Sequence, residues 1–537
     1  MADSGVFQEN YDVAIIGGGI NGAGIARDLS QRGLSVLLVE KNDFGSGTTA
    51  ASTRLIHGGL RYLEHFDFAL VRESLHERKI LLQIAPHLVF PLEFILPVYA
   101  GQEYGRAKLK AGMLLYDILS LGKSLPKHRM LSRRRILRLQ QGMNPQGLHG
   151  GFAYFDCQVP LPERLTLENI RAARQAGALC LNYHRLAGLE VAGDGRWQVR
   201  FEDVDTGEQH QAAAGIVINA AGPWVNDIAG LADPRRPRLV GGTRGSHILV
   251  ANTLGLRHAL YSPARSDGRP FFIIPFGRDE LLIGTTDIFY DASVDEVRAD
   301  SLEVRYLISE TNHLLPELNI RPEMIRMTYS GVRPLPPAEG KDAGAVTRRH
   351  FIKQHETGDD RRAFLSIIGG KLTTYRQLAE EVGDKVADLL SAHLPGSRTA
   401  REPLPGTPEK KPWQRRPVRR RTFPELNSDP LLLYGKARRH ILEIAGVDSV
   451  EKMSPDEILV AEARYCARHE QVRHLDDFLL RRSMWGLRRG KEGDYASAAA
   501  QAMARELAWT DSRMLLEIAR YNRILARAFS WQEDTER

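Results

Sequence analysis

The segment that most constrains the fold is residues 11–40, YDVAIIGGGINGAGIARDLSQRGLSVLLVE. Residues 13–16 form an unbroken apolar run, which is typical of a strand covered on both faces of a parallel sheet. Gly17, Gly19 and Gly22 follow as G-x-G-x-x-G. The first glycine permits a tight turn, the second lets a pyrophosphate approach the backbone, and the third lets a helix pack against the strand. The order of strand, glycine turn, helix and strand predicts a dinucleotide-binding unit.

Two further features of this segment indicate what it binds. The free N–H groups at the start of the predicted helix, and its dipole, favour phosphate. The second predicted strand ends at Glu40, where a carboxylate can accept hydrogen bonds from ribose hydroxyls. The motif does not separate FAD from NAD, and the acid argues only against NADP. A redox enzyme is the expected class of protein.

Length and composition set outer limits. A chain of 537 residues with 43% hydrophobic and 26% charged residues is expected to form two or three globular domains. Its three cysteines, Cys157, Cys180 and Cys466, are far apart and form no C-x-x-C. Structural zinc, iron–sulfur clusters and disulfides are therefore not expected, and no metal site is predicted. We expect neither a signal peptide at the N-terminus nor a membrane-spanning helix.

The chain is basic, with a net charge of +7 and a pI near 9.2. Part of this charge gathers in a Pro-containing stretch around Trp413: Lys410, Lys411, Arg415, Arg416, Arg419, Arg420 and Arg421. The stretch is either a solvated linker or a contact for anionic lipid headgroups. No RNA-binding signature accompanies it, so nucleic acid is ranked low as a partner.

The remaining pattern predicts an α/β fold with three parts. Apolar strands at 216–219 and 364–368 extend the first sheet, and a glycine turn at 369–370 opens a helix over about 373–390. Strands at 246–250, 271–276 and 281–284 have the spacing of an antiparallel sheet in a substrate domain. Residues 396–429 are expected to be a linker, and residues 430–537 an all-α domain.

The first two parts are expected to interleave along residues 1–395. The Rossmann-like domain takes about 11–75, 150–235 and 330–395, and the substrate domain takes about 76–149 and 236–329. Residues 106–131 have an apolar stripe flanked by lysines and arginines. This segment is either an ordinary amphipathic core helix or a helix lying in a membrane interface.

Seven segments beyond the first glycine turn resemble the FAD-dependent, respiratory (aerobic) glycerol-3-phosphate dehydrogenases. They are RLIHGGLRYLE at 54–64, AGPWV at 221–225, GTTD at 284–287, YSGVRPL at 329–335, GGKLTTYR at 369–376, AEARY with RHE at 461–470, and DDFLLRR at 476–482. The resemblance covers nearly the whole chain. It implies FAD as cofactor, oxidation of sn-glycerol 3-phosphate to dihydroxyacetone phosphate, and transfer of the electrons to a membrane quinone. It also implies a peripheral protein on the cytoplasmic face of the inner membrane that is often oligomeric.

The resemblance also implies where the cofactor lies. The expected FAD-binding residues are Gly17, Gly19, Gly22, Glu40, Thr48, Ser52, Ala221, Gly222, Gly370, Lys371, Leu372 and Thr373.

The expected chemistry requires cations and a base. A phosphate dianion calls for guanidinium or ammonium groups, and Arg333 is the first candidate, followed by Arg54, Lys371 and Arg376. His57 is the candidate base for the C2 hydroxyl proton, or it merely fixes the loop. Lys371 either stabilises charge on the reduced flavin or contacts phosphate. The catalytic set is therefore His57, Arg333 and Lys371.

Several alternatives remain open from sequence. Thr285, Thr286 and Asp287 are either substrate contacts or only a strand end. A glycerol-3-phosphate oxidase that reduces O₂, and a flavin amine or amino-acid oxidase, share the expected architecture. A nucleic-acid-binding protein that uses the dinucleotide as a sensor has only the arginine run in its support.

Overall fold

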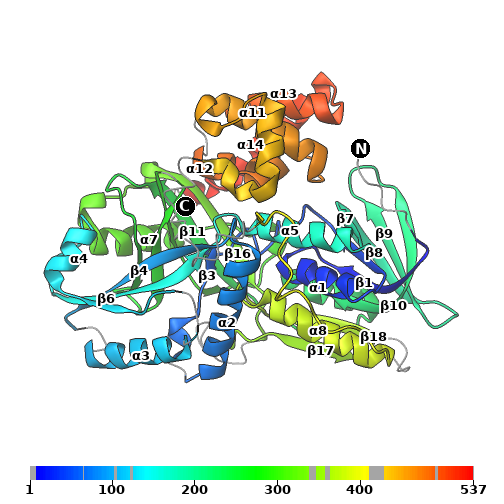
Figure 1. Cartoon of the computed structure of the whole chain (residues 1–537), viewed down its shortest axis with the longest axis horizontal. Coiled ribbons are helices and arrows are strands. Elements are labelled where there is room, and N and C mark those ends of the chain that lie inside the picture. Colours follow the sequence, from blue (N-terminus) through cyan, green and yellow to red (C-terminus); the bar gives the residue numbers. More distant parts are fainter. Residues whose placement is uncertain are drawn as a thin grey trace.

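The computed structural model describes residues 8–63, 66–101, 106–120, 122, 125–277, 279–337, 346–356, 363–409, 429–489 and 494–535. In this part of the chain, two large sheets lie beside each other beneath a layer of C-terminal helices (Figure 1). The basic cluster at 410–421 lies outside the described residues.

The first sheet is the predicted Rossmann-like sheet. It runs in the order β17-β18-β10-β1-β2-β7, and β1, β2, β7, β10 and β18 are parallel. Its antiparallel additions are β17 at one edge and the β8–β9 pair on β10. The bounds are β1 Asn10–Ile16, β2 Val36–Glu40, β7 Leu179–Asn182, β8 His184–Val191, β9 Trp197–Asp203, β10 Gln209–Asn219, β17 Phe351–His355 and β18 Ala363–Ile368.

Helix α1 (Ile20–Gln31) begins directly after the glycine turn and packs between α5 (Pro162–Gln175) and α8 (Tyr375–Leu390). Gly17 has φ +110°, which favours glycine. A Cβ on Gly22 would lie 1.9 Å from the Gly17 carbonyl oxygen. The turn and the close helix–strand packing therefore both require the residues that the motif predicted.

The second sheet is mostly antiparallel, as expected, and among the described strands only β4 and β12 form a parallel pair. Its main order is β15-β11-β14-β13-β12-β4-β6-β3, with β16 on β11 and β5 on β6. The bounds are β3 Leu55–Ile56, β4 Phe90–Tyr99, β5 Arg129–Leu131, β6 Leu148–Gln158, β11 Thr243–Ala251, β12 Ala259–Pro263, β13 Pro270–Phe276, β14 Glu280–Gly284, β15 Ile288–Phe289 and β16 Ile325–Arg333.

The expected boundaries between the two interleaved parts need one correction. Strands β3 and β6 fall in segments that we assigned to the Rossmann-like part, yet they pair within the second sheet. The chain crosses from one sheet to the other within these segments, and pairing with β4 draws β6 to the second sheet. No break in composition marks that crossing.

The remaining helices cover the sheets and form the C-terminal layer. The first group is α2 Phe68–Ile84, α3 Arg106–Leu119, α4 Arg133–Leu139, α6 Val225–Ala232 and α7 Ser301–Leu314. The C-terminal group is α10 Arg438–Ala445, α11 Pro455–His469, α12 Trp485–Arg489, α13 Tyr495–Leu507 and α14 Asp511–Arg527. A capping box between Ser454 and Glu457 starts α11. None of the helices described is long and apolar enough to cross a bilayer.

Helix α3 occupies the first half of the segment 106–131. Its inner face buries Met113 and Tyr116, while Leu114 and Ile118 are 57% and 51% exposed on its outer face. The helix therefore buries an apolar face, as expected, and it also exposes two apolar side chains on its outer face.

Candidate cofactor and substrate site

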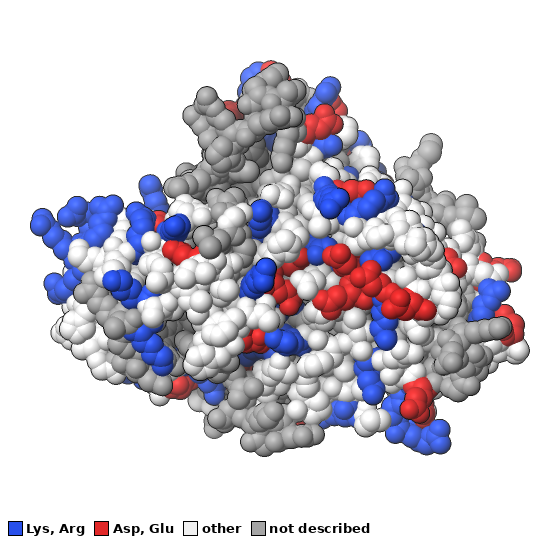
Figure 2. Space-filling model, turned by 60° about the horizontal axis from the view of Figure 1, so that its bottom comes forward, with Lys and Arg blue, Asp and Glu red and all other residues white. Residues whose placement is uncertain are grey.

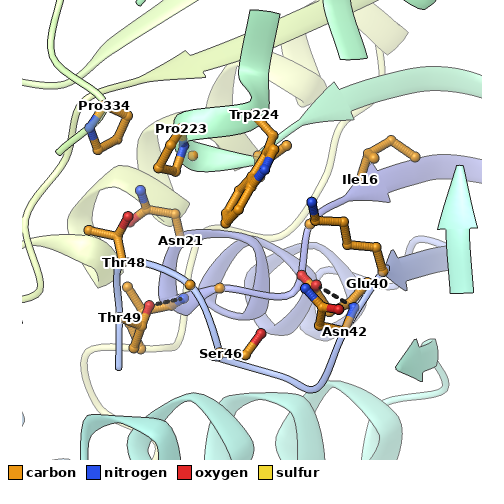
Figure 3. Close-up of a pocket in the computed structure, with 18 of the residues that line it drawn as sticks. Ile16, Asn21, Glu40, Asn42, Ser46, Thr48, Thr49, Pro223, Trp224 and Pro334 are labelled. Atoms are coloured by element: carbon orange, nitrogen blue, oxygen red, sulfur yellow. Dashed lines mark hydrogen bonds between the residues drawn. The ribbon is translucent and has the colours of Figure 1, made fainter. Parts of the chain in front are cut away.

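A long cavity runs along the carboxyl ends of the parallel strands of the first sheet, where open α/β sheets bind ligands (Figure 3). Ten of the twelve residues expected to hold the cofactor line it: Gly17, Gly19, Glu40, Thr48, Ser52, Ala221, Gly222, Gly370, Lys371 and Leu372. Gly22 instead packs against the Gly17 carbonyl, and Thr373 hydrogen-bonds to the backbone of His57. Segments as distant as 17–22, 40–52, 220–224 and 369–372 thus meet around one space.

Glu40 closes the nucleotide end of this cavity. Its carboxylate accepts hydrogen bonds from the backbone N–H of Gly18 at 2.7 Å and of Asn42 at 2.8 Å. Burial raises the pKa of Glu40, and these two donors oppose that effect. The carboxylate is thus fixed at the end of β2, in the place where the motif expects a ribose.

The helix start beside the glycine turn is held by a residue that the sequence reasoning missed. Thr49 Oγ1 accepts a hydrogen bond from the backbone N–H of Ile20 at 3.2 Å (Figure 3). Thr48 donates its hydroxyl to the Val332 carbonyl at 2.7 Å, and Tyr329 donates to the Ser52 carbonyl at 3.1 Å. The loop at 48–52 is therefore pinned to β16, so the second sheet helps to shape the cofactor cavity.

Lys371 also lines the cavity, from the glycine turn before α8. Its Nζ is buried, has no hydrogen-bond partner among the residues that the structure describes, and lies 3.8 Å from the centre of the Tyr62 ring. Burial lowers the pKa of Lys371 to about 7, even though Glu73 and Asp67 favour its charged form. A buried, unpartnered ammonium at a cavity wall is suited to bind an anion.

Arg333 stands at the end of β16 in a frame of three residues. Its guanidinium donates to Asp287 Oδ1 at 2.9 Å, to Thr285 Oγ1 at 2.9 Å and to the Thr286 carbonyl at 3.1 Å. The segment 285–287, for which substrate contact and a mere strand end were both open, thus orients Arg333. Arg348 donates to the other carboxylate oxygen of Asp287 at 2.7 Å. Two guanidinium groups share one carboxylate, which leaves a positive excess.

His57 lies half-buried near these cations. Its backbone N–H donates to Thr373 Oγ1 at 3.2 Å, which ties the end of β3 to the turn that carries Lys371. Burial lowers the pKa of His57, Asp156 opposes this, and Lys371 adds to it. The imidazole is therefore favoured in its neutral form, which is the form that accepts a proton.

A single neighbour connects His57, Arg333 and Lys371. Burial lowers the pKa of each of the three, and the positive charge of Arg348 lowers each pKa further. Arg348 is thus a charge that acts on all three residues of the predicted catalytic set. Nothing in the sequence pointed to Arg348 except the pair of arginines at 348–349.

Two predicted phosphate ligands do not fit this geometry. The guanidinium of Arg54 is 1% exposed, and both terminal nitrogens donate to the Glu163 carboxylate at 3.0 Å. Arg376 is 4% exposed and donates to Glu77 at 2.6 and 2.7 Å. Each arginine is neutralised by a buried carboxylate far away in sequence, so both are corrected to structural roles.

Comparison with known protein families supports a cofactor site in this cavity. The family model for FAD dependent oxidoreductases matches residues 12–376, and the model for the C-terminal domain of alpha-glycerophosphate oxidase matches residues 397–514.

Individual relatives agree as well. A glycerol-3-phosphate dehydrogenase of Synechocystis is 49% identical over 74% of this chain and 73% of its own length. The aerobic glycerol-3-phosphate dehydrogenase of Escherichia coli is 36% identical over 89% and 95%. A D-erythritol 1-phosphate dehydrogenase of Brucella abortus is 36% identical over 88% and 94%.

A solved structure extends the agreement to the fold. The glycerol-3-phosphate dehydrogenase of Bacillus halodurans, complexed with FAD, aligns with a TM-score of 0.74 at 26% identity, covering 98% of this chain and 95% of that one. The glycine turn, the fixed acid and the unpartnered lysine described above suit the same cofactor, which is FAD. The chain belongs to the FAD-dependent glycerol-3-phosphate dehydrogenase family.

Proposed function

We propose that this protein oxidises sn-glycerol 3-phosphate to dihydroxyacetone phosphate and passes the electrons to a membrane quinone. The observation that carries the proposal is the group of cations that act on His57. Arg333 and Arg348 share the Asp287 carboxylate, and the positive charges of Arg348 and Lys371 both lower the pKa of His57. A small substrate with a phosphate dianion and a neighbouring hydroxyl matches this arrangement.

The residues divide the work by their chemistry. Arg333, held by Asp287 and Thr285, presents a fixed guanidinium to the phosphate, and Arg348 adds a second charge. His57, neutral near pH 7, accepts the C2 hydroxyl proton as the carbonyl forms. FAD supplies the acceptor for the C2 hydride. Lys371 supplies a positive charge for the phosphate or for the reduced cofactor.

The decisive experiment is anaerobic titration of the purified flavoprotein. We expect sn-glycerol 3-phosphate to bleach the flavin absorbance and to leave one dihydroxyacetone phosphate per flavin. D-Erythritol phosphate tests the activity named for the Brucella relative, and glycine and proline test the amino-acid oxidase alternative. Bleaching by an amino acid but not by glycerol 3-phosphate would refute the proposal.

The acceptor is tested separately, because oxidases have related folds. A short-chain quinone should reoxidise the reduced flavin in preference to O₂. One hydrogen peroxide per turnover, with no response to quinone, would identify an oxidase instead. This result would change the acceptor and leave the proposed substrate in place.

A peripheral position on an anionic membrane, at the cytoplasmic face, completes the proposal. Leu114 and Ile118 project from α3, and Arg133, Arg134, Arg135 and Arg138 of α4 are exposed. Both helices lie toward one end of the molecule, and Figure 2 shows lysine and arginine side chains gathered at that end. Apolar side chains flanked by cations are the features by which a helix binds a lipid surface.

A further inference from the structure

The motif DDFLLRR at 476–482 belongs to the C-terminal domain but reaches the cofactor-binding domain. Residues Asp477–Arg482 form a π-helical turn, a rare conformation that is frequent at functional sites. Arg482 is 0% exposed and Arg481 is 8% exposed, although both are charged. Buried guanidinium groups require partners, and the partner that these two share is Asp43.

The carboxylate of Asp43 is fully buried and accepts hydrogen bonds from both arginines. Arg482 forks across it, with Nη1–Oδ2 at 2.7 Å and Nη2–Oδ1 at 2.9 Å, and Arg481 Nε donates to Oδ2 at 2.7 Å. Burial alone would raise the pKa of Asp43, but Arg482 and Arg481 hold it below the ordinary value. The charged form of Asp43 is thus maintained by the C-terminal domain.

The short loop that contains Asp43 also contains the acid at the ribose end of the cavity. Glu40 lies three residues before Asp43, and the Asn42 N–H between them donates to the Glu40 carboxylate at 2.8 Å. The Gly45 N–H donates to the Gly18 carbonyl at 3.0 Å, inside the glycine turn. Because of these hydrogen bonds, a displacement of Asp43 would also shift Glu40 and Gly18.

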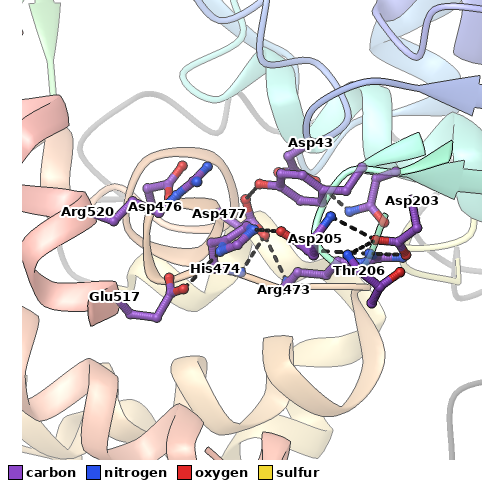
Figure 4. A network of polar contacts seen from close by, with 12 residues as sticks. Asp43, Asp203, Asp205, Thr206, Arg473, His474, Asp476, Asp477, Glu517 and Arg520 are labelled. Atoms are coloured by element: carbon purple, nitrogen blue, oxygen red, sulfur yellow. Dashed lines mark hydrogen bonds and ion pairs between the residues drawn. The ribbon is translucent and has the colours of Figure 1, made fainter. Parts of the chain in front are cut away.

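The arginines are fixed from their own side as well. Arg481 Nη2 donates to Asp476 at 2.6 Å and to Asp477 at 2.5 Å. Tyr183 donates to the Asp477 carboxylate at 2.5 Å, and His474 bridges Asp205 and Glu517 at 3.1 and 2.9 Å (Figure 4). These contacts form a connected set of charged hydrogen bonds between the C-terminal domain and the cofactor-binding domain, which we call the domain seam.

We propose that Arg481 and Arg482 are positioning residues for FAD: through Asp43 they hold the loop at 40–46, and with it Glu40, in the binding geometry. The C-terminal domain then contributes to cofactor affinity without lining the cavity. Because coupling between two sites is reciprocal, bound FAD must also stabilise the docking of the 476–482 turn. The inference requires that the protein binds FAD, and it does not depend on which substrate the protein oxidises.

The test compares two matched substitutions in the holoenzyme. Asp43→Asn and Glu470→Gln each neutralise a buried carboxylate that receives a forked arginine across the same domain seam. Glu470 forms its hydrogen bonds with Arg164 of α5 and has only a long ion pair with Arg482, at 3.9 Å between Oε2 and Nε. Its side chain makes no hydrogen bond to the described loop at 40–46. The rate of FAD release is followed by the fluorescence of free flavin after dilution.

We expect Asp43→Asn to speed FAD release by about tenfold or more, within the range of typical coupling between sites. Glu470→Gln should stay within about twofold of the wild type. Arg482→Lys, which keeps the charge but loses the fork, should give an intermediate rate, and it replaces Asp43→Asn if that variant yields no holoenzyme. Unchanged release in the Asp43 and Arg482 variants would overturn the proposal, and so would equal acceleration by Glu470→Gln.

Reciprocity supplies a second readout. Amide hydrogen exchange in residues 476–483 should slow when FAD is added in excess to partly loaded protein, and α11 in the same domain should change less. Asp43→Asn should abolish the difference. Equal protection of both segments would show general domain docking and overturn a specific role for the turn.

Discussion

At the residue scale, the partner of an arginine decides its role. The side chain of Arg54 is 2% exposed against Glu163, whereas that of Arg333 is 20% exposed against Asp287. Arg54 has a carboxylate to itself, while Arg333 shares Asp287 with Arg348. A buried guanidinium with its own carboxylate stabilises the fold. A partly exposed guanidinium that shares its carboxylate with a second cation is available to a ligand.

Replacement of Arg333 tests this reading. Arg333→Ala should lower kcat/KM for glycerol 3-phosphate by about 100-fold or more, since hydrogen bonds to charged groups are worth about 1.5–3 kcal/mol each. Asp287→Asn should mainly raise KM, because the guanidinium loses its anchor. The flavin content, measured by absorbance, should stay at the wild-type value. A KM and kcat for Arg333→Ala within twofold of wild type would remove Arg333 from the site.

Lys371 predicts a pH dependence of binding. In the free site its pKa is about 7, and a bound dianion raises that pKa. Binding therefore takes up a proton above pH 7, and affinity falls by up to about tenfold per pH unit there. Calorimetry at pH 8 in two buffers, with an unreactive phosphate monoester whose second ionisation near pH 6 is complete, measures this uptake. Lys371→Met should abolish it, and zero uptake by the wild type would contradict the assignment.

At the element scale, helix α1 can pack against the end of β1 only because Gly22 has no side chain. Because a Cβ on Gly22 would lie 1.9 Å from the backbone oxygen of Gly17, the helix has to move outward in Gly22→Ala. We expect a loss of stability of about 1–3 kcal/mol or more and little bound FAD, measured by thermal unfolding and flavin absorbance.

Two other glycines provide the controls for Gly22. A Cβ on Gly19 meets only Thr49 Oγ1, at 3.7 Å, so Gly19→Ala should fold normally but bind FAD weakly. Gly230 in α6 has open space, so Gly230→Ala should keep the normal FAD content and raise the stability by up to about 1 kcal/mol, because alanine favours the helix. Normal FAD content in Gly22→Ala would contradict the packing argument.

Helix α3 makes a prediction about membranes. The double substitution Leu114→Glu and Ile118→Glu should reduce binding to anionic liposomes by about tenfold or more, because burying one such side chain is worth about 1.5–3 kcal/mol. Leu302→Glu, at a 72% exposed position on α7, is the matched control and should bind normally. Cosedimentation measures both. Equal binding by the double variant and the control would exclude α3 as the lipid contact.

Sequence reasoning located elements whose determinants are local. The strand, the glycine turn and Glu40 lie within 30 residues, so periodicity and spacing were sufficient to predict a dinucleotide site, while FAD itself was implied by the family resemblance. It could not assign Arg54, because the carboxylate that neutralises it, Glu163, lies 109 residues away. Arg348 was missed because it lies in a loop without periodicity, and its partner Asp287 is 61 residues away.

At the scale of the whole molecule, the Arg54–Glu163 pair joins the two sheets, because Arg54 precedes β3 of the second sheet and Glu163 begins α5 over the first. Arg54→Met leaves a buried carboxylate without its cation, which costs about 3–5 kcal/mol. We expect a lower thermal midpoint with an unchanged KM, and recovery of most of the midpoint in Arg54→Met/Glu163→Leu. A large rise in KM with an unchanged midpoint would return Arg54 to the substrate site.

The contact between Asp43 and Arg482 spans 439 positions of the chain. Domains generally fold in the order of their synthesis, N-terminal first. The glycine turn therefore leaves the ribosome long before the arginines that complete its supporting loop. If Arg481 and Arg482 position FAD as proposed, we expect lasting flavin retention only after residue 482 has been translated, and rapid loss of FAD from a chain truncated before that point.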